Sequence, residues 1–375
     1  MEQTTFYRPT KATVQLDAIR QNVKNLQQYL GAETRVIAVV KADGYGHGEV
    51  EVAKAALEAG AIMAAVATPD EAVRLRKGGV KGDILVMGPA PASFAKFAAE
   101  EEITVTATGV DWLTDVLAGT PLSKSLKIHV KIDSGMGRIG IREEEELKTF
   151  YSLAKEAENI ILDGIFTHFA CADEENPTAT EQQFNRFMEL VDVLPEKPRL
   201  VHASNSAASL LYPTYALDAV RFGVGLYGIA PSDYVEQNLP FPLVRALTLK
   251  TKLAFVKKLP ANSKISYGGT YETGGDEWIG TLPIGYADGL RRGLRGQEVL
   301  IGGERVPIVG TICMDQCMVR LPKEMPVGEE VVLIGQQGKE EITMEEWADR
   351  LQTIPYEIAV SMAKRVPREY IGKTE

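Results

Sequence analysis

Alternation between short apolar runs and amphipathic segments dominates the first part of this 375-residue chain. Apolar runs of strand length, rich in Val, Ile and Ala, recur eight times over about 200 residues, and segments with helical periodicity separate most of them. Strands joined by such crossovers form a parallel sheet. Eight units predict an α/β fold of the (β/α)8 TIM-barrel type, and the lack of a GxGxxG after the first strand disfavours an open dinucleotide-binding sheet.

The expected elements can be placed along the chain. The predicted barrel strands are residues 35–41, 62–67, 84–87, 103–107, 127–132, 161–167, 199–203 and 219–222. The predicted helices include residues 17–30, with Asp17 as cap, and residues 50–59, 69–77, 111–118, 143–158 and 180–194. Residues 12–16 are predicted to form an edge strand.

The pattern changes after Pro240, where short β-rich runs are separated by Gly and Pro turns. These runs are residues 247–256, 278–282, 298–301, 304–311, 316–320 and 330–334. They predict a mostly antiparallel β domain, with one helix at 343–351 capped by Thr343. The predicted domains are therefore a barrel at 12–243 and a β domain at 244–375, to which residues 1–11 are candidates to pair.

Polar side chains collect where the predicted barrel strands end, which is where barrels of this type carry their chemistry. They are Lys41, Lys131, Asp133, Arg138, His168, His202, Asn205, Ser206 and Arg221. A desolvated lysine such as Lys41 is costly unless it is paired or reacts as a nucleophilic amine, for example by forming a Schiff base with a carbonyl. The alternative is a strand-end lysine that reaches water, and this segment alone does not decide between the two.

The loops after the last two predicted strands suit a phosphate. They read Ala-Ser-Asn-Ser-Ala-Ala at 203–208 and Arg-Phe-Gly-Val-Gly-Leu-Tyr-Gly at 221–228. Small residues let backbone N–H groups approach a phosphate closely, although a tight turn into a helix would explain the glycines equally simply. Together with Lys41, these loops suggest a phosphorylated aldehyde bound as a Schiff base, which is pyridoxal 5'-phosphate.

Composition narrows the choice of partner and compartment. A net charge of −10 argues against nucleic acid or an anionic membrane surface, and no apolar run reaches the roughly 18 residues that span a bilayer. Residues 1–10 show no secretory signal. Three cysteines, Cys171, Cys313 and Cys317, suit a reducing cytoplasm, and without a second cysteine pair no metal site is predicted.

Five motifs, spread over essentially the whole chain, resemble those of the alanine racemase family. They are Ala-Val-Val-Lys-Ala-Asp-Gly-Tyr-Gly-His-Gly at 38–48, the 221–228 motif, Ile-Ser-Tyr-Gly-Gly-Thr-Tyr at 265–271, Gly-Tyr-Ala-Asp-Gly at 285–289 and Cys-Met-Asp at 313–315. The resemblance implies a pyridoxal-phosphate enzyme that interconverts L- and D-alanine and so supplies D-alanine for peptidoglycan. It also implies a homodimer with shared active sites.

The resemblance assigns roles to particular residues. Lys41 and Tyr267 are implied as the two bases, and Arg221 as the partner of the pyridine nitrogen. The implied cofactor contacts are Lys41, Tyr45, His168, Asn205, Ser206, Arg221, Gly223, Val224 and Tyr356. The implied substrate contacts are Arg138, Met314, Asp315 and Tyr286, with Tyr286 narrowing access to the pocket. Lys131 in this family can be carbamylated, which would let it brace Arg138.

These roles are chemically consistent. Racemisation needs proton removal on one face and delivery on the other, hence two acid/base groups. Tyr has an ordinary pKa of about 10 and needs nearby cations to act as a base near neutrality, which His168 and Arg221 are placed to provide. An arginine, whose ordinary pKa exceeds 12, should leave the ring nitrogen unprotonated and so restrain side transamination. His129 and His202 are predicted to pack and hydrogen-bond inside the barrel.

Three alternatives stay open on the sequence alone. A related pyridoxal-phosphate amino-acid decarboxylase shares the layout, but it is expected to pair the pyridine nitrogen with a carboxylate, and Arg221 argues against that. A non-enzymatic cofactor-binding barrel would not need the added β domain that carries Tyr267. A racemase for another or broader set of small amino acids remains, because substrate size is weakly encoded.

Overall fold

The computed structural model describes residues 6–119 and 121–373, and these form two compact units. One unit runs from Leu16 to Arg245. The other joins the described residues up to Gln15 with those from Ala246 onward. Part of the predicted pairing of residues 1–11 falls on residues 1–5, which lie outside the described residues.

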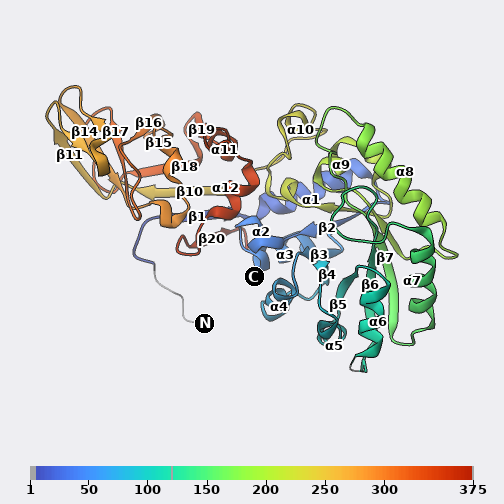
Figure 1. The fold of residues 1–375 in the computed structure, drawn as a ribbon. Helices are drawn as coiled ribbons and strands as arrows, with labels where there is room; N and C mark the ends of the chain where they lie inside the picture. The colour runs from blue at the N-terminus through green and yellow to red at the C-terminus, as the bar shows by residue number, and fades with distance from the viewer. Residues whose placement is uncertain (1–5, 120, 374–375) are drawn as a thin grey trace. The chain divides into compact units, whose positions relative to one another are not determined.

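The first unit is built on an eight-stranded parallel sheet with the order β8-β7-β6-β5-β4-β3-β2-β9 (Figure 1). Its strands are β2 (Arg35–Val39), β3 (Met63–Val66), β4 (Asp83–Pro89), β5 (Ile103–Ala107), β6 (Leu126–Lys131), β7 (Ile160–Phe166), β8 (Leu200–His202) and β9 (Ala219–Phe222). The two end strands meet, because Asp218 N donates to Val201 O at 3.1 Å and Arg221 N to Ser204 O at 2.9 Å. The sheet therefore closes nearly into a barrel, and the predicted fold class is confirmed.

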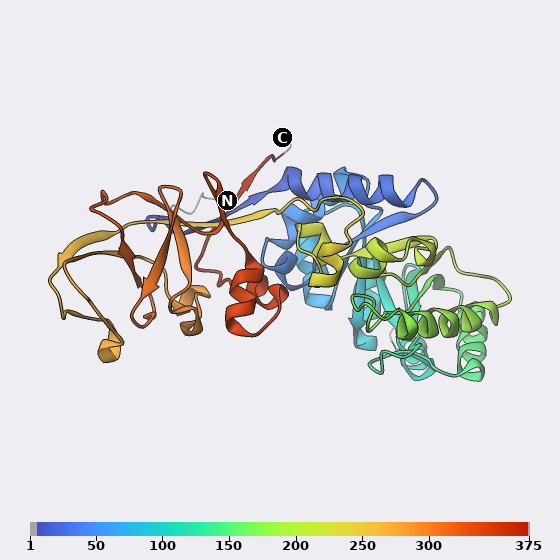
Figure 2. The ribbon, with the colours of Figure 1, turned by 90° about the horizontal axis from the view of Figure 1, so that it is seen from above.

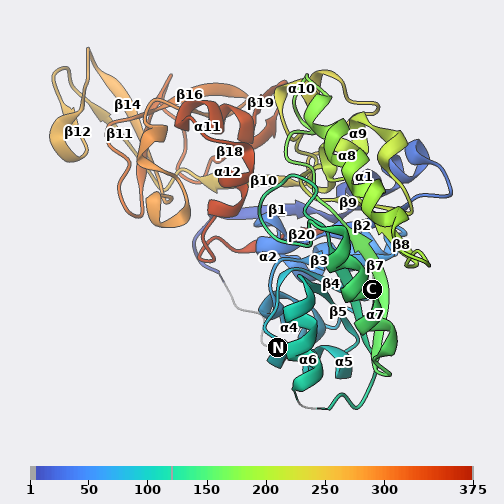
Figure 3. The same cartoon turned by 45° about the vertical axis from the view of Figure 1, so that its right-hand side comes forward.

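Helices lie around the outside of these strands (Figure 3). They are α1 (Leu16–Leu30), α3 (Glu49–Glu58), α4 (Pro69–Lys77), α5 (Ala95–Glu100), α6 (Val110–Ala118), α7 (Glu144–Glu156), α8 (Thr178–Asp192), α9 (Ser206–Leu211) and α10 (Asp233–Gln237). Helical periodicity explains how they pack: in α8 the buried positions 180, 183, 187, 190 and 191 follow the three-to-four-residue spacing of one helix face. The predicted helix at residues 69–77 is confirmed as α4, with Pro69 in its first turn.

The barrel strands are buried on both faces, as the β-branched runs predict. All five residues of β5 and the four of β3 are buried. Polar exceptions inside the unit include His129, Lys131, His202 and Arg221, each at most 3% exposed. Because a buried polar group needs a partner or a task, these exceptions point to the site.

The second unit is a mostly antiparallel sheet with the order β11-β14-β17-β16-β15-β18-β10-β1-β20, and β19 pairs with β18. Its strands are β1 (Lys11–Gln15), β10 (Leu247–Lys252), β11 (Phe255–Leu259), β14 (Glu277–Leu282), β15 (Glu298–Ile301), β16 (Glu304–Val309), β17 (Cys317–Leu321), β18 (Glu330–Gln337), β19 (Glu340–Ile342) and β20 (Arg368–Ile371). A small hairpin of β12 (Lys264–Ile265) and β13 (Tyr271–Glu272) and two helices, α11 (Met344–Leu351) and α12 (Pro355–Ser361), complete it.

The prediction that residues 12–16 form an edge strand is wrong in two respects: the strand has a neighbour on each side, and it ends at Gln15. β1 lies between β10 and β20, antiparallel to the first and parallel to the second (Figure 2). Leu16 already begins α1. Apolar alternation identifies a strand but carries no information on which strands flank it, and here both partners lie more than 200 residues further along the chain. Among the described residues, no helix is long and apolar enough to cross a membrane.

Candidate active site

Five of the predicted site residues line one pocket in the barrel unit. Lys41 follows β2, Lys131 ends β6 and Arg221 lies in β9, so the parallel strands bring all three to the same rim. The pocket encloses about 400 Å³, an ordinary size for a small-molecule site. Its lining residues are Lys41, Ala67, Met87, Gly88, Pro89, Lys131, Arg138, Ile139, Phe166, His168 and Arg221.

The pocket is strongly cationic, because four lining residues are Lys or Arg and none is acidic. Burial and Arg138, with a smaller contribution from Arg221, lower the pKa of Lys41, while Glu71 opposes this shift. Burial and Arg138 also lower the pKa of Arg221 to about 9, so its guanidinium stays charged at neutral pH. A pocket with this excess of positive charge favours anionic ligands, and a lysine with a lowered pKa is a better nucleophile.

Among the four basic residues that line the pocket, Lys131 has the most unusual surroundings. It is 2% exposed, and its Nζ finds no hydrogen-bond partner among the described residues. The Nζ lies 4.7 Å from the centre of the Phe166 ring. Burial, Arg221 and Arg138 hold the pKa of Lys131 well below its ordinary value. A buried amine in this state is costly unless a partner or a reaction compensates for its burial.

Arg221 is held rigidly by acceptors from the neighbouring strand ends. Its Nη2 donates to Thr167 O and Ala203 O, both at 2.7 Å, and lies 3.2 Å from His168 Nδ1. Its Nη1 donates to His202 Nδ1 at 2.9 Å. Within the described part of the chain these contacts leave the Nε–H without a protein partner. The arginine is therefore fixed in direction while retaining one donor for a ligand in the pocket that it lines.

A chain of buried histidines supports Arg221 from inside the barrel. His202 Nε2 lies 3.0 Å from His129 Nδ1, and His129 Nε2 lies 3.3 Å from Asp163 Oδ2. Asp163 also accepts two bonds from Arg199, at 2.8 and 2.7 Å. Since Arg221 can only donate, both imidazoles must carry their proton on Nε2, and burial lowers the pKa of each. The predicted interior packing and hydrogen bonding of the two histidines is confirmed.

The backbone just after Lys41 is strained. In the short element α2 (Lys41–Tyr45), residues 42–44 have φ of 54, 55 and 60°, and Tyr45 continues with a φ of 49°. Three of these four residues carry side chains, and the left-handed conformation costs such residues roughly 1–2 kcal/mol each. Bonds within the turn, such as Gly44 N to Val40 O at 2.9 Å, only partly offset this cost. Strain of this kind persists where the surrounding structure holds it in place.

The predicted phosphate loops form a close cradle. The Ser206 hydroxyl accepts from Gly223 N at 2.8 Å and from Gly225 N at 3.3 Å. A side chain at position 223 would meet the Tyr45 hydroxyl at 2.9 Å and would have to displace it. Hydroxyl and backbone N–H groups from three segments thus converge, which suits a phosphate dianion. Asn205 lies beside them as the cap of α9, where its side chain accepts from Ala208 N at 3.0 Å.

The remaining predicted residues belong to the β unit. Tyr267 follows Ser266, whose φ is +66°, and is 74% exposed in the single chain. The Ser266 hydroxyl donates to Thr311 O at 2.5 Å, and the Thr311 hydroxyl donates to Tyr267 O at 3.0 Å. The phenol is therefore carried by a tight, well-anchored turn although its side chain is open to solvent. Tyr356 lies in α12 and is half-buried.

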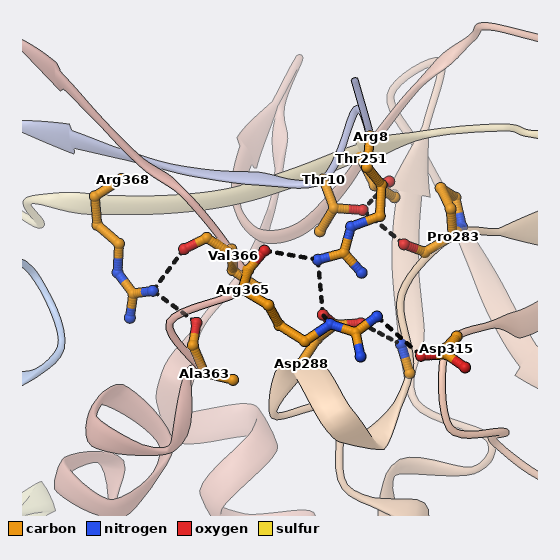
Figure 4. Close-up of polar contacts among 11 residues, drawn as sticks. Arg8, Thr10, Thr251, Pro283, Asp288, Asp315, Ala363, Arg365, Val366 and Arg368 are labelled. Carbon is orange, nitrogen blue, oxygen red and sulfur yellow. Dashed lines mark hydrogen bonds and ion pairs between the residues drawn. The ribbon is translucent and has the colours of Figure 1, made fainter. Parts of the chain in front are cut away.

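A buried carboxylate, Asp288, links the turn that carries Tyr286 to the loop that carries Met314 and Asp315. Figure 4 shows Asp288 with Arg8 and Arg365, and the contact of Arg365 with Asp315. Tyr286 N donates to the backbone of the loop before Met314, and Asp288, at the end of the same turn, is 2% exposed. Asp288 pairs with Arg8 at 2.7 Å and with Arg365 at 2.9 Å. The Arg365 Nη2 also donates to Asp315 Oδ1 at 2.8 Å. One arginine thus ties the Tyr286 turn to the loop that carries Met314 and Asp315.

Sequence reasoning missed three residues of these sites. Glu71, in the first turn of α4, accepts from Ala42 N at 2.7 Å, and Phe166 forms part of the pocket wall. Asp288 organises the turn in the β unit. A Thr-x-x-Glu capping signature at residues 68–71 was available for Glu71, but it marks a helix start rather than a site. In the sequence, Phe166 is marked only by its position near the end of a predicted strand. Asp288 is marked only as the aspartate of the Gly-Tyr-Ala-Asp-Gly motif.

Comparison with known proteins agrees with this geometry. The family described as alanine racemase, N-terminal domain, matches residues 14–231, and the alanine racemase C-terminal domain family matches residues 246–370. The chain is 47% identical to the alanine racemase of Geobacillus stearothermophilus over 363 residues, which cover 97% of this chain and 94% of that protein.

Solved structures extend the agreement to the fold. The crystal structure of alanine racemase from Bacillus anthracis with bound L-Ala-P has a TM-score of 0.94 and 45% identity, covering 98% of this chain and 96% of that one. A histidine racemase from Leuconostoc mesenteroides has a TM-score of 0.91 at 31% identity, covering 98% and 99% of the two chains. With both family domains matched over nearly its whole length, this chain belongs to the alanine racemase family.

Proposed function

We propose that this chain interconverts L-alanine and D-alanine, using pyridoxal 5'-phosphate held through Lys41. The observation that carries the proposal is the cationic pocket that both Lys41 and Arg221 line. The pKa of Lys41 is lowered there, and backbone carbonyl groups hold the guanidinium of Arg221 in place. Its relatives named alanine racemase, and the Bacillus anthracis structure with bound L-Ala-P, support alanine as the substrate. When bound, pyridoxal phosphate supplies the electron sink that lets the α-proton of an amino acid leave.

The residues of the barrel unit suit this cofactor. Ser206, Tyr45 and the backbone of Gly223 and Val224 would hold the phosphate, since the hydroxyls of Ser206 and Tyr45 both lie close to Gly223. Phosphate contacts from Tyr356 in the β unit, and cofactor contacts from Asn205 and His168, complete the proposed set. Asn205 already caps α9, so we expect its role to be the placement of Ser206.

Arg221 would face the pyridine nitrogen. Its Nη groups are taken by protein acceptors, which leaves the Nε–H to donate to that nitrogen. A guanidinium that stays charged at neutral pH gives up its proton reluctantly, even with a pKa near 9. With Arg221 as its partner the pyridine nitrogen would stay unprotonated, so bound pyridoxal phosphate would act as a weaker electron sink and side transamination would be restrained. The decarboxylase alternative expects a carboxylate beside the pyridine nitrogen, whereas Arg221 lines the pocket and none of the other lining residues is acidic.

The buried Lys131 amine is the proposed site of carbamylation. A neutral amine adds carbon dioxide and releases a proton, which converts the side chain into an anion. Burial and two neighbouring arginines favour the neutral amine that this reaction needs, and the positive charge of the arginines also favours the anionic product. The carbamate would satisfy the orphaned Lys131 nitrogen and brace Arg138, which would in turn bind the substrate carboxylate with Met314 and Asp315.

Tyr267 is the proposed second base. It lies on an anchored turn of the β unit and is 74% exposed in the single chain, and Met314 and Tyr286 are 52% and 43% exposed. We propose that these residues complete the site of a second copy in a two-fold dimer, so that each dimer has two shared sites. We place the enzyme in the cytoplasm, where its three free cysteines would stay reduced, and assign it to D-alanine supply for peptidoglycan.

Borohydride reduction tests the cofactor assignment. The purified protein should be yellow, lose its visible absorption on reduction, and carry the reduced label on Lys41 in peptide mass spectrometry. Recovery of the label on Lys131 instead would contradict the assignment. A panel of L-amino acids followed by chiral chromatography tests the substrate: alanine should be racemised fastest, and a preference for histidine would favour the activity named for the Leuconostoc relative.

Subunit mixing tests the shared site. Lys41→Ala and Tyr267→Phe variants should each be inactive, and their mixture under exchanging conditions should recover about a quarter of wild-type activity. Half of the dimers are then mixed, and in each of these one of the two sites carries neither lesion. Absence of recovery, with exchange demonstrated by mass tags, would show that both bases come from one chain.

A further inference from the structure

The direction of the Lys41 side chain depends on the strained turn that follows it, and this turn has an anchor outside itself. We infer that Glu71 is a positioning residue for Lys41: its carboxylate clamps the left-handed turn after β2 and places a negative charge beside the amine. The inference deepens the proposed function and rests on it, because it takes Lys41 as the amine that holds the cofactor.

The carboxylate of Glu71 bridges two loops at the barrel rim. Its Oε1 accepts from Ala42 N, at 2.7 Å, immediately after Lys41. Its Oε2 accepts from Ala67 N at 2.7 Å and from Thr68 N at 3.1 Å, in the loop after β3. Glu71 is 8% exposed, so these bonds are shielded from water. The two loops are thereby fixed to each other by a single side chain.

The turn needs this clamp because its own bonds do not use the Ala42 amide. Within the turn, Gly44 N donates to Val40 O at 2.9 Å and Gly46 N to Ala42 O at 3.0 Å. Ala42, Asp43 and Tyr45 all have positive φ, a conformation that side-chain-bearing residues leave when released. Relaxation to right-handed geometry at Ala42 would rotate the backbone on which Lys41 is carried.

Glu71 also has a plain structural role, which must be separated from the proposed one. It forms a capping box at the start of α4, in which the Thr68 hydroxyl accepts from Glu71 N at 3.3 Å. A capping box uses one carboxylate oxygen, here Oε2, and leaves Oε1 free for Ala42. Removing the Thr68 hydroxyl therefore weakens the cap without touching the clamp, which gives a matched control.

The charge of Glu71 shifts the pKa of Lys41 in the opposite direction from the other charged groups near that lysine. Arg138 and Arg221 lower the pKa of Lys41, together with burial, and Glu71 raises it. A glutamine at position 71 would remove this opposing charge. It would also turn an amide NH2 toward either Ala42 or the Ala67–Thr68 pair, because only one of its two terminal atoms can accept.

The test compares Glu71→Gln with the control Thr68→Ala in the full-length protein. Hydrogen exchange measured by mass spectrometry should become about tenfold faster in residues 41–48 of the Glu71 variant and stay unchanged there in the control. After cofactor removal with hydroxylamine, the pH midpoint for acetylation of Lys41 should fall by about one unit in the Glu71 variant only.

Equal exchange of residues 41–48 in the two variants would overturn the inference. If Glu71→Gln fails to fold, Glu71→Asp replaces it, since the shorter carboxylate keeps the charge and the cap but cannot reach Ala42. The same acceleration is then expected with a smaller change in the midpoint. The borohydride label decides the proposed function separately: its absence from Lys41 would refute that proposal, whereas the exchange data report on the clamp alone.

Discussion

Asp163 anchors the histidine chain at the end remote from Arg221, and its replacement by Asn should be costly. The carboxylate is 6% exposed and accepts three hydrogen bonds, two from Arg199 and one from His129. Hydrogen bonds to charged groups contribute about 1.5–3 kcal/mol each, but Arg199 is 48% exposed and water would replace part of its bonding. We therefore expect Asp163→Asn to lower the free energy of unfolding by about 2–3 kcal/mol.

The effect should depend on pH in a defined direction. Burial alone would raise the pKa of Asp163, but the hydrogen bonds from His129 and Arg199 outweigh it and hold that pKa well below its ordinary value. A carboxyl with a lowered folded-state pKa stabilises the fold above its unfolded pKa and loses this contribution as the pH falls. The difference between wild type and variant should be constant from pH 5 to 8 and shrink below about pH 4.

Tryptophan fluorescence can follow the barrel unit by itself. The chain has three tryptophans, and a background with Trp278→Phe and Trp347→Phe leaves Trp112 as the only reporter. Urea unfolding in this background gives the free-energy difference at each pH. Asp192→Asn is the matched control, because the ion pair of Asp192 with Lys197, at 2.8 Å, lies between side chains that are 65% and 54% exposed and should contribute less than about 0.5 kcal/mol. An equal loss at pH 3 and pH 7 would refute the argument from charge.

Three further changes should separate strong local interactions from weak ones. Thr343→Ala removes the hydroxyl of the α11 capping box and should lower the free energy of urea unfolding of the β unit by about 1 kcal/mol. Arg305→Ala breaks ion pairs with three partly exposed glutamates, yet it should cost less than about 1 kcal/mol, and 1 M salt should remove most of that. Gly140→Ala should cost more than about 1 kcal/mol in the Trp112 assay, because φ is +120° and the new Cβ would lie 2.8 Å from Lys131 O.

The parts of the fold that show a clear burial pattern in the sequence could be predicted. The runs at 103–107 and 219–222 are β5 and β9 to the residue, because a strand buried on both faces is a run of mainly apolar and β-branched residues, in which Arg221 is the charged exception. The flanks of β1 and the left-handed turn after Lys41 could not be predicted. The first depends on partners far along the chain, and the second on a carboxylate from another helix that holds a locally unfavourable conformation.

The candidate site likewise has one part that could be predicted from the sequence and one part that could not. Lys41, Lys131 and Arg221 could be grouped from the sequence, since parallel strands end on one rim, and they do line one pocket. The path from Arg221 through His202 and His129 to Asp163 could not be predicted, because strand periodicity does not say which inward side chains touch across a closed sheet. The roles of Tyr267 and Asp315 remain predictions from the family resemblance.

The position of β1 has a consequence for synthesis on the ribosome. Every strand of the barrel sheet has been made once residue 222 has emerged, so this unit can fold while the chain is still growing. β1 is made first, but its partner β10 appears some 230 residues later and β20 only at Arg368–Ile371. The nascent chain must carry the unpaired edges of β1 throughout this interval, which leaves β1 open to misassembly for longer than any strand of the barrel sheet.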